Sequence, residues 1–190
     1  MAEGFLVAYS QSNPGDQVDV LDLFAEDLPA FDLAAANAKY KMMHGKEHSR
    51  QEEQVWQGIL NVIDRFKSAD KYILAVPMWN FSIPYRLKQY IDIIVQPGQT
   101  FTVNEQGGYE GLAGGKPVLA IYARGGEYTP GSEAEAFDAQ KKYVEQMLAF
   151  IGLTDIRSIV VEPTLASGPE VAVKKRQDAI ARAQELAGTF

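Results

Sequence analysis

The stretch from Lys71 to Ile94 limits the possible folds most, because its periodicity changes within a few residues. Residues 71–76 form a short apolar and aromatic run after a charged segment, which predicts a strand buried on both faces. Residues 85–94 then carry apolar side chains at helical spacing, at Leu87, Tyr90, Ile91 and Ile94. Strand, loop and helix in this order predict one unit of an open α/β sheet. Ligands of such sheets bind at the carboxyl ends of the strands, so we expect the intervening loop to contact one.

The loop between this strand and helix has a composition that suits a flat, conjugated ligand. Met78, Trp79 and Phe81 offer polarizable and aromatic surface, while Asn80 and the peptide groups can bind ring heteroatoms. Aromatic residues and prolines in a strand-to-helix turn more often serve packing and chain direction. Composition alone therefore leaves both interpretations open.

A second predicted strand also ends in residues that permit a close approach to a ligand. Residues 115–123 form an apolar run, and Arg124, Gly125 and Gly126 follow it. Two adjacent glycines allow the backbone to come into contact with a planar ring and to direct N–H groups at its polar edge. The Arg-Gly-Gly sequence is equally common in plain turns, so it is weak evidence by itself.

Helices and strands alternate along the rest of the chain. Ser49 and Glu52 form a capping-box pattern before an amphipathic helix at 55–66, which we expect to cover the sheet beside the 71–76 strand. Further predicted elements are a weak helix at 34–43, a hairpin or flap at 100–109, helices at 133–152 and 169–186, and a strand at 155–161. This order predicts an α/β, doubly wound parallel sheet with helices on both faces, in a single domain of residues 1–190.

The first residues do not begin as a doubly wound fold should. Residues 5–9 are typical of the end of an amphipathic helix, residues 13–16 of a turn, and residues 18–23 alternate like a strand. We therefore expect the chain to open inside the first helix, without the first β-strand and its loop. Alternatively, residues 9–13 are a phosphate-binding loop, since they carry hydroxyls. Only residues 14–17 separate them from the next predicted strand, too few for a crossover helix, which favours the helix end.

Composition excludes several classes of function. The chain has 190 residues, no cysteine and a formal net charge of −7. It therefore lacks a thiolate nucleophile, a disulfide framework and a zinc-thiolate site, and its charge disfavours nucleic acid as a partner. No apolar run approaches the ~20 residues of a membrane span, and no leader is present, so we expect a cytoplasmic protein. His44 and His48 lie four residues apart, but Gly45 between them and the lack of a third ligand predict no metal site.

Several blocks of sequence, in order, resemble one known family. They comprise residues 77–84 and 87–92, then 98–101, 110–112, 115–116, 123–126 and 150–152, so they span most of the chain. These blocks are similar to those of the FMN-dependent NADH-azoreductases, also described as NADH:quinone oxidoreductases, of the flavodoxin-like superfamily. The resemblance implies a flavodoxin-like fold, FMN as cofactor, NADH with quinones or azo compounds as substrates, and a homodimer with the flavin near the subunit interface.

The resemblance also implies which residues form the site. The expected cofactor-binding residues are Pro77, Met78, Trp79, Asn80, Phe81, Ala123, Arg124, Gly125 and Gly126. The expected substrate-binding residues are Phe101, Tyr109 and Tyr128, the first two on a flap over the site. The family has Ser-Arg-Gly-Gly where residues 123–126 of this chain are Ala-Arg-Gly-Gly. Ala123 therefore lacks the hydroxyl, and only its main chain can make a contact there.

The reaction that the resemblance implies needs few side chains of the protein. The sequence contains no Ser/His/acid set, P-loop or dinucleotide glycine fingerprint, so hydrolysis and phosphoryl transfer lack their parts. A flavin carries the electrons itself, and donors near its N1 and O2 stabilise its reduced form. We expect a ping-pong reaction in which NADH leaves before the acceptor binds. No side chain is a compelling catalytic acid, and solvent can supply the protons.

The expected loss of the phosphate loop leaves two further hypotheses open. Charged hydrogen bonds are each worth ~1.5–3 kcal/mol, so ring contacts alone would hold FMN only weakly. The chain would then be a non-catalytic or cofactor-poor member of the family. Alternatively, it is a flavodoxin-like electron carrier or binding module, which one-electron transfer without NADH turnover would indicate.

Overall fold

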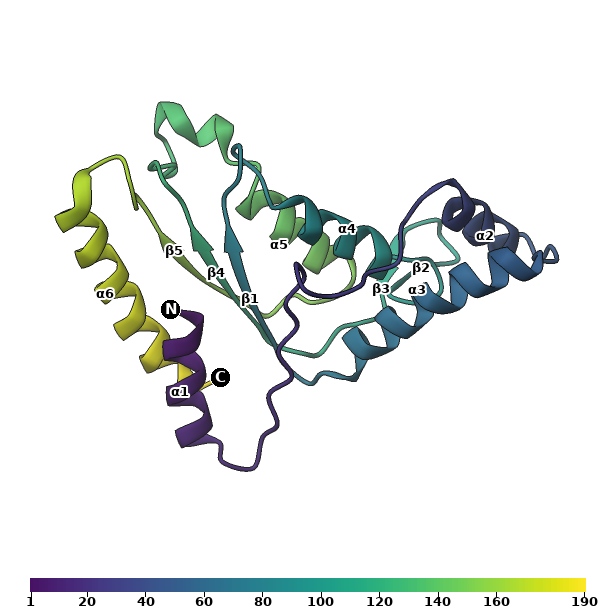
Figure 1. The fold of residues 1–190 in the computed structure, drawn as a ribbon, viewed down its shortest axis with the longest axis horizontal. Helices are drawn as coiled ribbons and strands as arrows, with labels where there is room; N and C mark the ends of the chain where they lie inside the picture. The colour runs from purple at the N-terminus through teal and green to yellow at the C-terminus, as the bar shows by residue number, and fades with distance from the viewer.

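The computed structural model describes all residues from 1 to 190 as a parallel sheet with helices on both faces and a small separate hairpin (Figure 1). The helices are α1 (Ala2–Ser12), α2 (Leu33–Met43), α3 (Arg50–Ser68), α4 (Tyr85–Ile94), α5 (Lys141–Phe150) and α6 (Gly168–Ala187), with a 3-10 helix η1 (Glu133–Phe137). The sheet strands are β1 (Tyr72–Pro77), β4 (Val118–Ala123) and β5 (Ile156–Val161), and β2 (Phe101–Val103) pairs with β3 (Tyr109–Gly111).

The three sheet strands run in parallel in the order β1-β4-β5 and end level with one another. Pro77 at the end of β1 pairs with Ala123 at the end of β4, and Ala123 pairs with Val161 at the end of β5. The loops that follow these residues therefore leave the sheet at one edge, which we call the carboxyl edge. This is the edge at which parallel α/β sheets bind ligands.

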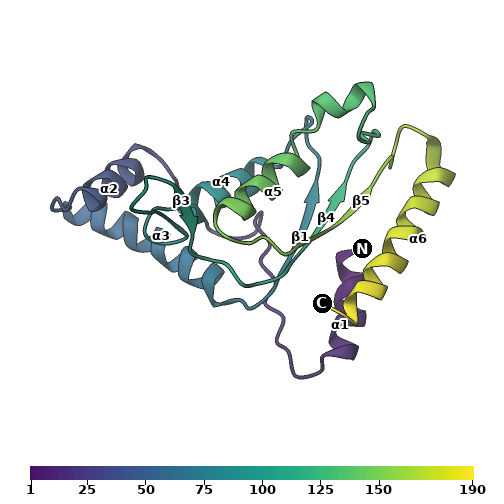
Figure 2. The ribbon, with the colours of Figure 1, turned by 180° about the vertical axis from the view of Figure 1, so that it is seen from behind.

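The side chains of the central strand β4 alternate between two apolar layers. Leu119 and Ile121 point into a cluster with Phe5 of α1 and Ala183 of α6, so these two helices cover one face. Val118, Ala120 and Tyr122 belong to a second cluster formed with α4 and α5 on the opposite face. Figure 2 shows the same arrangement from behind, with α6 and α1 side by side and α4 beside α5. Because β4 is buried on both faces, it reads as a continuous apolar run.

Helix α3 contacts the sheet only near its end, contrary to our expectation that it covers the sheet. Phe66 stacks on Tyr72 of β1 with ring centroids 4.6 Å apart. The apolar stripe further back, including Ile59 and Ile63, packs with α2 and with Ile93 of α4 in a cluster of its own. The amphipathic pattern correctly predicts a helix, but it does not identify the elements on which the apolar stripe packs. These are α2 and α4.

The strand predicted at residues 18–23 is absent, which corrects the sequence analysis. This segment has no regular structure, and β1 has no neighbour on its outer side. Arg65 binds Asp19 through two hydrogen bonds of 2.9 Å, which holds the segment against α3 rather than in the sheet. The expectation that β1 is buried on both faces is also wrong, since Ala75 and Pro77 are exposed on the face where Ile73 joins the cluster of α1 and α6.

The helix predicted at residues 133–152 is also interrupted. The chain forms η1, leaves helical geometry at residues 138–140, and resumes as α5. Asp138 causes the break, because one of its carboxylate oxygens accepts hydrogen bonds from the backbone N–H groups of Gln140 and Lys141 while the other binds Arg124. An acidic side chain that bonds the following N–H groups favours a new helix start over a continuous helix.

The N-terminal helix end is confirmed, and the phosphate-loop alternative for residues 9–13 is not supported. Tyr9 to Ser12 lie in the last turn of α1, where the helix dipole is negative and repels anions. The Tyr9 hydroxyl is also occupied, since it donates to Asp16 and accepts from Lys71. The capping box of Ser49 and Glu52 at the start of α3 is confirmed as well. None of the helices is both long and apolar enough to cross a bilayer.

Candidate functional site

Two loops at the carboxyl edge begin side by side. The N–H of Met78, the first residue after β1, donates to the carbonyl of Ala123 at 2.8 Å, which continues the β1–β4 ladder by one hydrogen bond. The N–H of Arg124 donates in turn to Val161 of β5 at 3.0 Å. The loop after β1, which begins at Met78, and the loop after β4, which contains Gly125 and Gly126 and which we call the diglycine loop, therefore lie at one edge of the sheet (Figure 1).

The loop after β1 makes a tight turn of unusual backbone geometry. Trp79 and Ser82 exchange two backbone hydrogen bonds of 2.9 and 3.0 Å, and the two residues between them have positive φ angles, 48° for Asn80 and 67° for Phe81. Such turns normally contain glycine or asparagine, and a bulky residue in this conformation is uncommon and strained. We call residues 79–82 the aromatic turn. Strain of this kind concentrates at functional sites.

The aromatic turn carries two exposed rings, each in contact with a neighbouring aromatic group. Trp79 is 45 % exposed and lies 5.4 Å from the ring of Phe24, which in turn contacts Tyr85. Phe81 is 49 % exposed and contacts Tyr128 after the diglycine sequence. Half-exposed aromatic faces at the carboxyl edge provide a surface on which a planar molecule can stack.

The diglycine loop offers main-chain groups, while its arginine side chain is buried and bound by three other side chains. The guanidinium of Arg124 binds Asp138, Gln140 and Glu162, and only 2 % of the residue is exposed. Gly125 and Gly126 donate no hydrogen bond to any backbone carbonyl, and the same holds for Asn80 and Phe81. Of the predicted residues here, Arg124 therefore offers no side-chain contact to a ligand, whereas the glycines have N–H groups available.

These residues fit a flavin ring system. Both loops present N–H groups that have no backbone acceptor, and the aromatic turn adds exposed ring faces beside them. A Cβ on Gly125 would lie 3.1 Å from the side chain of Leu165, and one on Gly126 would lie 3.1 Å from that of Tyr128, so glycine lets these two side chains pack close to the loop. The methyl side chain of Ala123 offers no hydrogen bond, so only its main chain could contribute. The donor set thus matches the polar edge of an isoalloxazine, and the aromatic set matches its faces.

Phe101 and Tyr109 lie apart from the loops of the carboxyl edge within one chain. The predicted hairpin is present as β2 and β3, and both rings pack on Phe150 near the end of α5, with centroids 4.7 and 5.3 Å away. Helix α5 leads from the carboxyl edge of the sheet toward the start of β5, so its end lies at the opposite edge. Gly111 fixes the hairpin there, because a Cβ on it would lie 2.2 Å from the backbone nitrogen of Gly152. Tyr128, by contrast, is at the site.

Sequence reasoning missed four residues of this region. Phe24 extends the aromatic surface, and Asp138, Gln140 and Glu162 bind Arg124. Phe24 lies in a turn outside the helices and strands, and it is held near Trp79 because Arg86 donates to the carbonyls of Leu23 and Glu26. No local pattern marks these residues, since each meets its partner only in the folded chain.

One buried group beside this region is a neutral phenol. Burial raises the pKa of Tyr122 well above its ordinary value, and its hydroxyl has no hydrogen-bond partner. The guanidinium of Arg124 lies 5.9 Å from the Tyr122 ring and 5.8 Å from the Tyr128 ring. The phenol therefore stays protonated at physiological pH and does not serve as a base.

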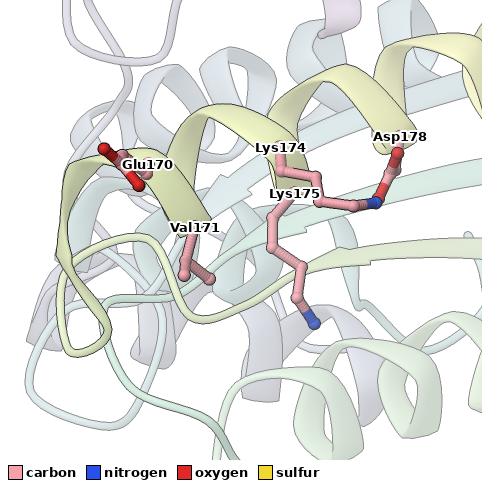
Figure 3. Close-up of a pocket in the computed structure, with 5 residues that line it drawn as sticks. All are labelled: Glu170, Val171, Lys174, Lys175 and Asp178. Carbon is pink, nitrogen blue, oxygen red and sulfur yellow. The ribbon is translucent and has the colours of Figure 1, made fainter.

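A hollow of about 450 Å³ elsewhere on the surface is no competing site. All five of its lining residues come from α6, and Lys174 and Asp178 among them form an ion pair of 2.7 Å (Figure 3). Lys175 extends away from this pair. A surface formed by one helix encloses no ligand, so the loops of the carboxyl edge remain the candidate site.

Comparisons with known proteins identify similar sequences and folds. A family model described as "Flavodoxin-like fold" matches residues 1–187. An FMN-dependent NADH:quinone oxidoreductase of Nitratidesulfovibrio vulgaris is 54 % identical over 190 residues, which cover 100 % of this chain and 90 % of that protein. A crystal structure of an azoreductase from Bacillus anthracis superposes with a TM-score of 0.90 at 31 % identity, covering 99 % of this chain and 89 % of the other. An FMN-dependent NADH-azoreductase from the same species, in complex with FMN, has a TM-score of 0.85 at 28 % identity, covering 98 % and 89 %.

Proposed function

The chain belongs to the family of proteins with the flavodoxin-like fold, and on that premise we propose that it is an FMN-dependent oxidoreductase that transfers two electrons from NADH to quinones and azo compounds. The names of its relatives, FMN-dependent NADH:quinone oxidoreductase and azoreductase, support this activity. The proposed cofactor-binding residues are Pro77, Met78, Trp79, Asn80, Phe81, Ala123, Gly125 and Gly126, with Arg124 acting through its position in the loop.

One structural observation carries the proposal: the aromatic turn and the diglycine loop follow the ends of adjacent strands. A hydrogen bond from the N–H of Met78 to the carbonyl of Ala123 joins these two strand ends. A ring system that rests on both loops meets aromatic surface and free N–H groups together. The positive φ angles of Asn80 and Phe81 give the turn a conformation that costs free energy of order 1–3 kcal/mol per residue. We interpret this cost as the price of presenting the N–H groups and rings toward a ligand.

Each group has a distinct role in this proposal. When bound, FMN supplies the redox chemistry, because it accepts a hydride from NADH and returns two electrons to the acceptor. The N–H groups of Gly125 and Gly126 would donate to the polar edge of the ring, where negative charge develops. Trp79 and Phe81 hold the ring faces and, with Phe24, limit access of water. No side chain is required as an acid, and NADH and the acceptor use the same open face in turn.

The proposal includes a second copy of the chain that meets the hairpin. Tyr109 is 68 % exposed and Val103 is 56 % exposed, at a place remote from the carboxyl edge of their own chain. In a homodimer this hairpin can approach the site of the partner subunit, where Phe101 and Tyr109 would act as substrate-binding residues beside Tyr128. The homodimer, the single domain of residues 1–190 and a cytoplasmic location are all parts of this proposal.

The two other hypotheses are less well supported. A non-catalytic or cofactor-poor chain would have no reason to retain the strained aromatic turn, and the similarity to enzymes extends over the whole chain. A one-electron carrier would not need the aromatic hairpin. Both hypotheses nevertheless predict measurable differences, which the following experiment separates.

Titration of the purified chain with FMN, against riboflavin as a control without phosphate, tests the proposal. We expect saturable binding of FMN, followed by NADH-dependent quinone reduction with parallel double-reciprocal lines, as a ping-pong order requires. The ratio of the two affinities measures what the phosphate contributes. A chain that binds neither flavin at micromolar concentration would refute the proposal, and binding without NADH turnover would favour an electron carrier.

A further inference from the structure

We infer that Arg124 is a positioning residue whose buried guanidinium fixes the ends of β1, β4 and β5 relative to one another, and that its side chain does not contact the cofactor. This inference rests on the proposed function only where it concerns FMN. Its structural part concerns the loops themselves and can be tested without a ligand.

The guanidinium has three different partners in three directions. Its Nε donates to Gln140 Oε1 at 2.9 Å, its Nη2 to Asp138 Oδ2 at 2.8 Å, and its Nη1 to Glu162 Oε2 at 3.2 Å. Arg124, Asp138 and Gln140 are all buried. Buried ionic hydrogen bonds are stronger than exposed ones, because solvent does not compete for the donors.

Two of these partners connect the guanidinium to the neighbouring strand ends. Gln140 Nε2 donates at 2.9 Å to the carbonyl of Val76, the residue before Pro77 in β1. Glu162 follows β5, and its Oε2 also accepts the N–H of Tyr128 at 3.0 Å, which closes the loop just after Gly126. One guanidinium thus connects the ends of three strands to both loops of the candidate site.

The main chain of Arg124 is engaged as well. Its N–H donates to Val161, and its carbonyl accepts from both the N–H and the hydroxyl of Thr164, at 2.9 and 2.8 Å. With side chain and main chain occupied, Arg124 has little left to offer a ligand. The free donors of the loop are those of Gly125 and Gly126, and the network determines where they point.

Lysine cannot replace arginine in this role. The planar guanidinium reaches three acceptors at fixed angles, whereas an ammonium is a point charge without this fork geometry. Arg124→Lys keeps the positive charge between Asp138 and Glu162, so it avoids leaving these two carboxylates without a cation, which would threaten folding. The substitution therefore changes geometry while it keeps charge.

Hydrogen exchange of backbone amides tests the structural part without any cofactor. In Arg124→Lys we expect the amides of Met78 and Tyr128 to exchange at least ~10-fold faster, the ratio that corresponds to ~1.4 kcal/mol and so to one weakened hydrogen bond. Amides in the middle of β4, such as Ala120, should be unchanged. Arg157→Lys is the matched control, because Arg157 lies near the opposite end of β5, where it hydrogen-bonds to Thr189 and pairs with Asp155 at 4.0 Å.

Flavin binding tests the functional part. We expect Arg124→Lys to bind FMN at least ~10-fold more weakly and to shift the midpoint potential of the bound flavin, because misplaced Gly125 and Gly126 donors stabilise the reduced form less. Arg157→Lys should match the wild type in both measurements. If Arg124 served the overall stability alone, the folded variant would bind FMN with unchanged affinity and potential, and that result would overturn the inference.

The outcomes separate this inference from the proposed function. If the wild type binds no flavin, the proposed function fails, while faster exchange in Arg124→Lys still supports the positioning role. Unchanged exchange at Met78 and Tyr128 overturns the positioning role whether or not FMN binds. If Arg124→Lys does not fold, Glu162→Gln replaces it in the test. Glutamine has the same shape as glutamate but no charge, so its hydrogen bonds are weaker. We expect faster exchange at Tyr128 but not at Met78. Equal exchange at Tyr128 in this variant and in the wild type would contradict the inference.

Discussion

Gln140 and Val76 are joined by a hydrogen bond of 2.9 Å, although they lie 64 residues apart in the sequence. The bond ties the break before α5 to the end of β1. It shows that the carboxyl edge is organised by long-range contacts of buried polar groups. Several consequences for binding, assembly and stability can be measured.

Removal of the exposed indole should weaken cofactor binding more than it weakens the fold. Trp79 is 45 % exposed, so we expect Trp79→Ala to change the free energy of unfolding by about 1 kcal/mol or less. Loss of a stacking face should lower FMN affinity by about 10-fold. Quenching of flavin fluorescence on titration measures this. Tyr40→Ala, which removes a 56 % exposed ring on α2, serves as the control and should bind FMN like the wild type.

Phe24 should influence the acceptor rather than the cofactor. Its ring contacts Trp79 and Tyr85 from a segment held by Arg86, at the outer side of the aromatic turn. We expect Phe24→Ala to raise the KM for quinones about 3- to 10-fold with little change in kcat, since uniform binding is lost. Steady-state kinetics with two quinones of different size test this. Leu33→Ala, nearby in sequence and 76 % exposed, should leave both constants unchanged.

The exposed hairpin should be required for assembly. Tyr109 packs on Phe101 and Phe150 but remains 68 % exposed. If the hairpin meets a second copy, Tyr109→Glu places a charge in that interface, and we expect monomers in analytical ultracentrifugation together with reduced turnover. Val173→Glu on α6, at a residue that is 46 % exposed, is the control and should sediment as the wild type does. A wild-type monomer with full activity would contradict the proposed dimer.

Acid should weaken the start of α3. The hydrogen bond from Lys41, followed by the bonds from Ser49, lowers the pKa of Glu52 from 4.5 to about 2. A carboxylate whose pKa is lower in the folded state stabilises the fold above its ordinary pKa and loses this contribution as pH falls toward the folded value. We expect the stability difference between wild type and Glu52→Gln to be largest near neutral pH and to shrink between pH 4.5 and about 2. Urea unfolding at several pH values checks this, and a difference that grows in acid would contradict it.

Patterns within a few residues of sequence predicted the elements well. The capping box at Ser49, the apolar run of β4 and the helical spacing of Leu87 and Ile91 all rest on local chemistry, and the structure confirms them. The alternation of residues 18–23 failed to predict the structure because Arg65 of α3 binds Asp19, so the segment does not pair with the open edge of β1. Pairing is a property of the whole fold and is not encoded in the segment.

The candidate site was predictable in its main chain but not in its buried polar groups. Gly125, Gly126 and the aromatic turn follow strand ends, and strand ends can be located from periodicity. The sequence does not predict the direction of the Arg124 side chain, because its partners Asp138, Gln140 and Glu162 come from other parts of the chain. The remote position of Phe101 and Tyr109 likewise depends on how Gly111 packs against Gly152.

An amide chemical-shift map of the protein with and without FMN would locate the bound cofactor directly. We predict that the N–H signals of Asn80, Phe81, Gly125 and Gly126 shift strongly on saturation, while that of Tyr40 on α2 shifts little. Unperturbed signals at both loops of the carboxyl edge, with FMN bound elsewhere, would contradict the assignment of the site.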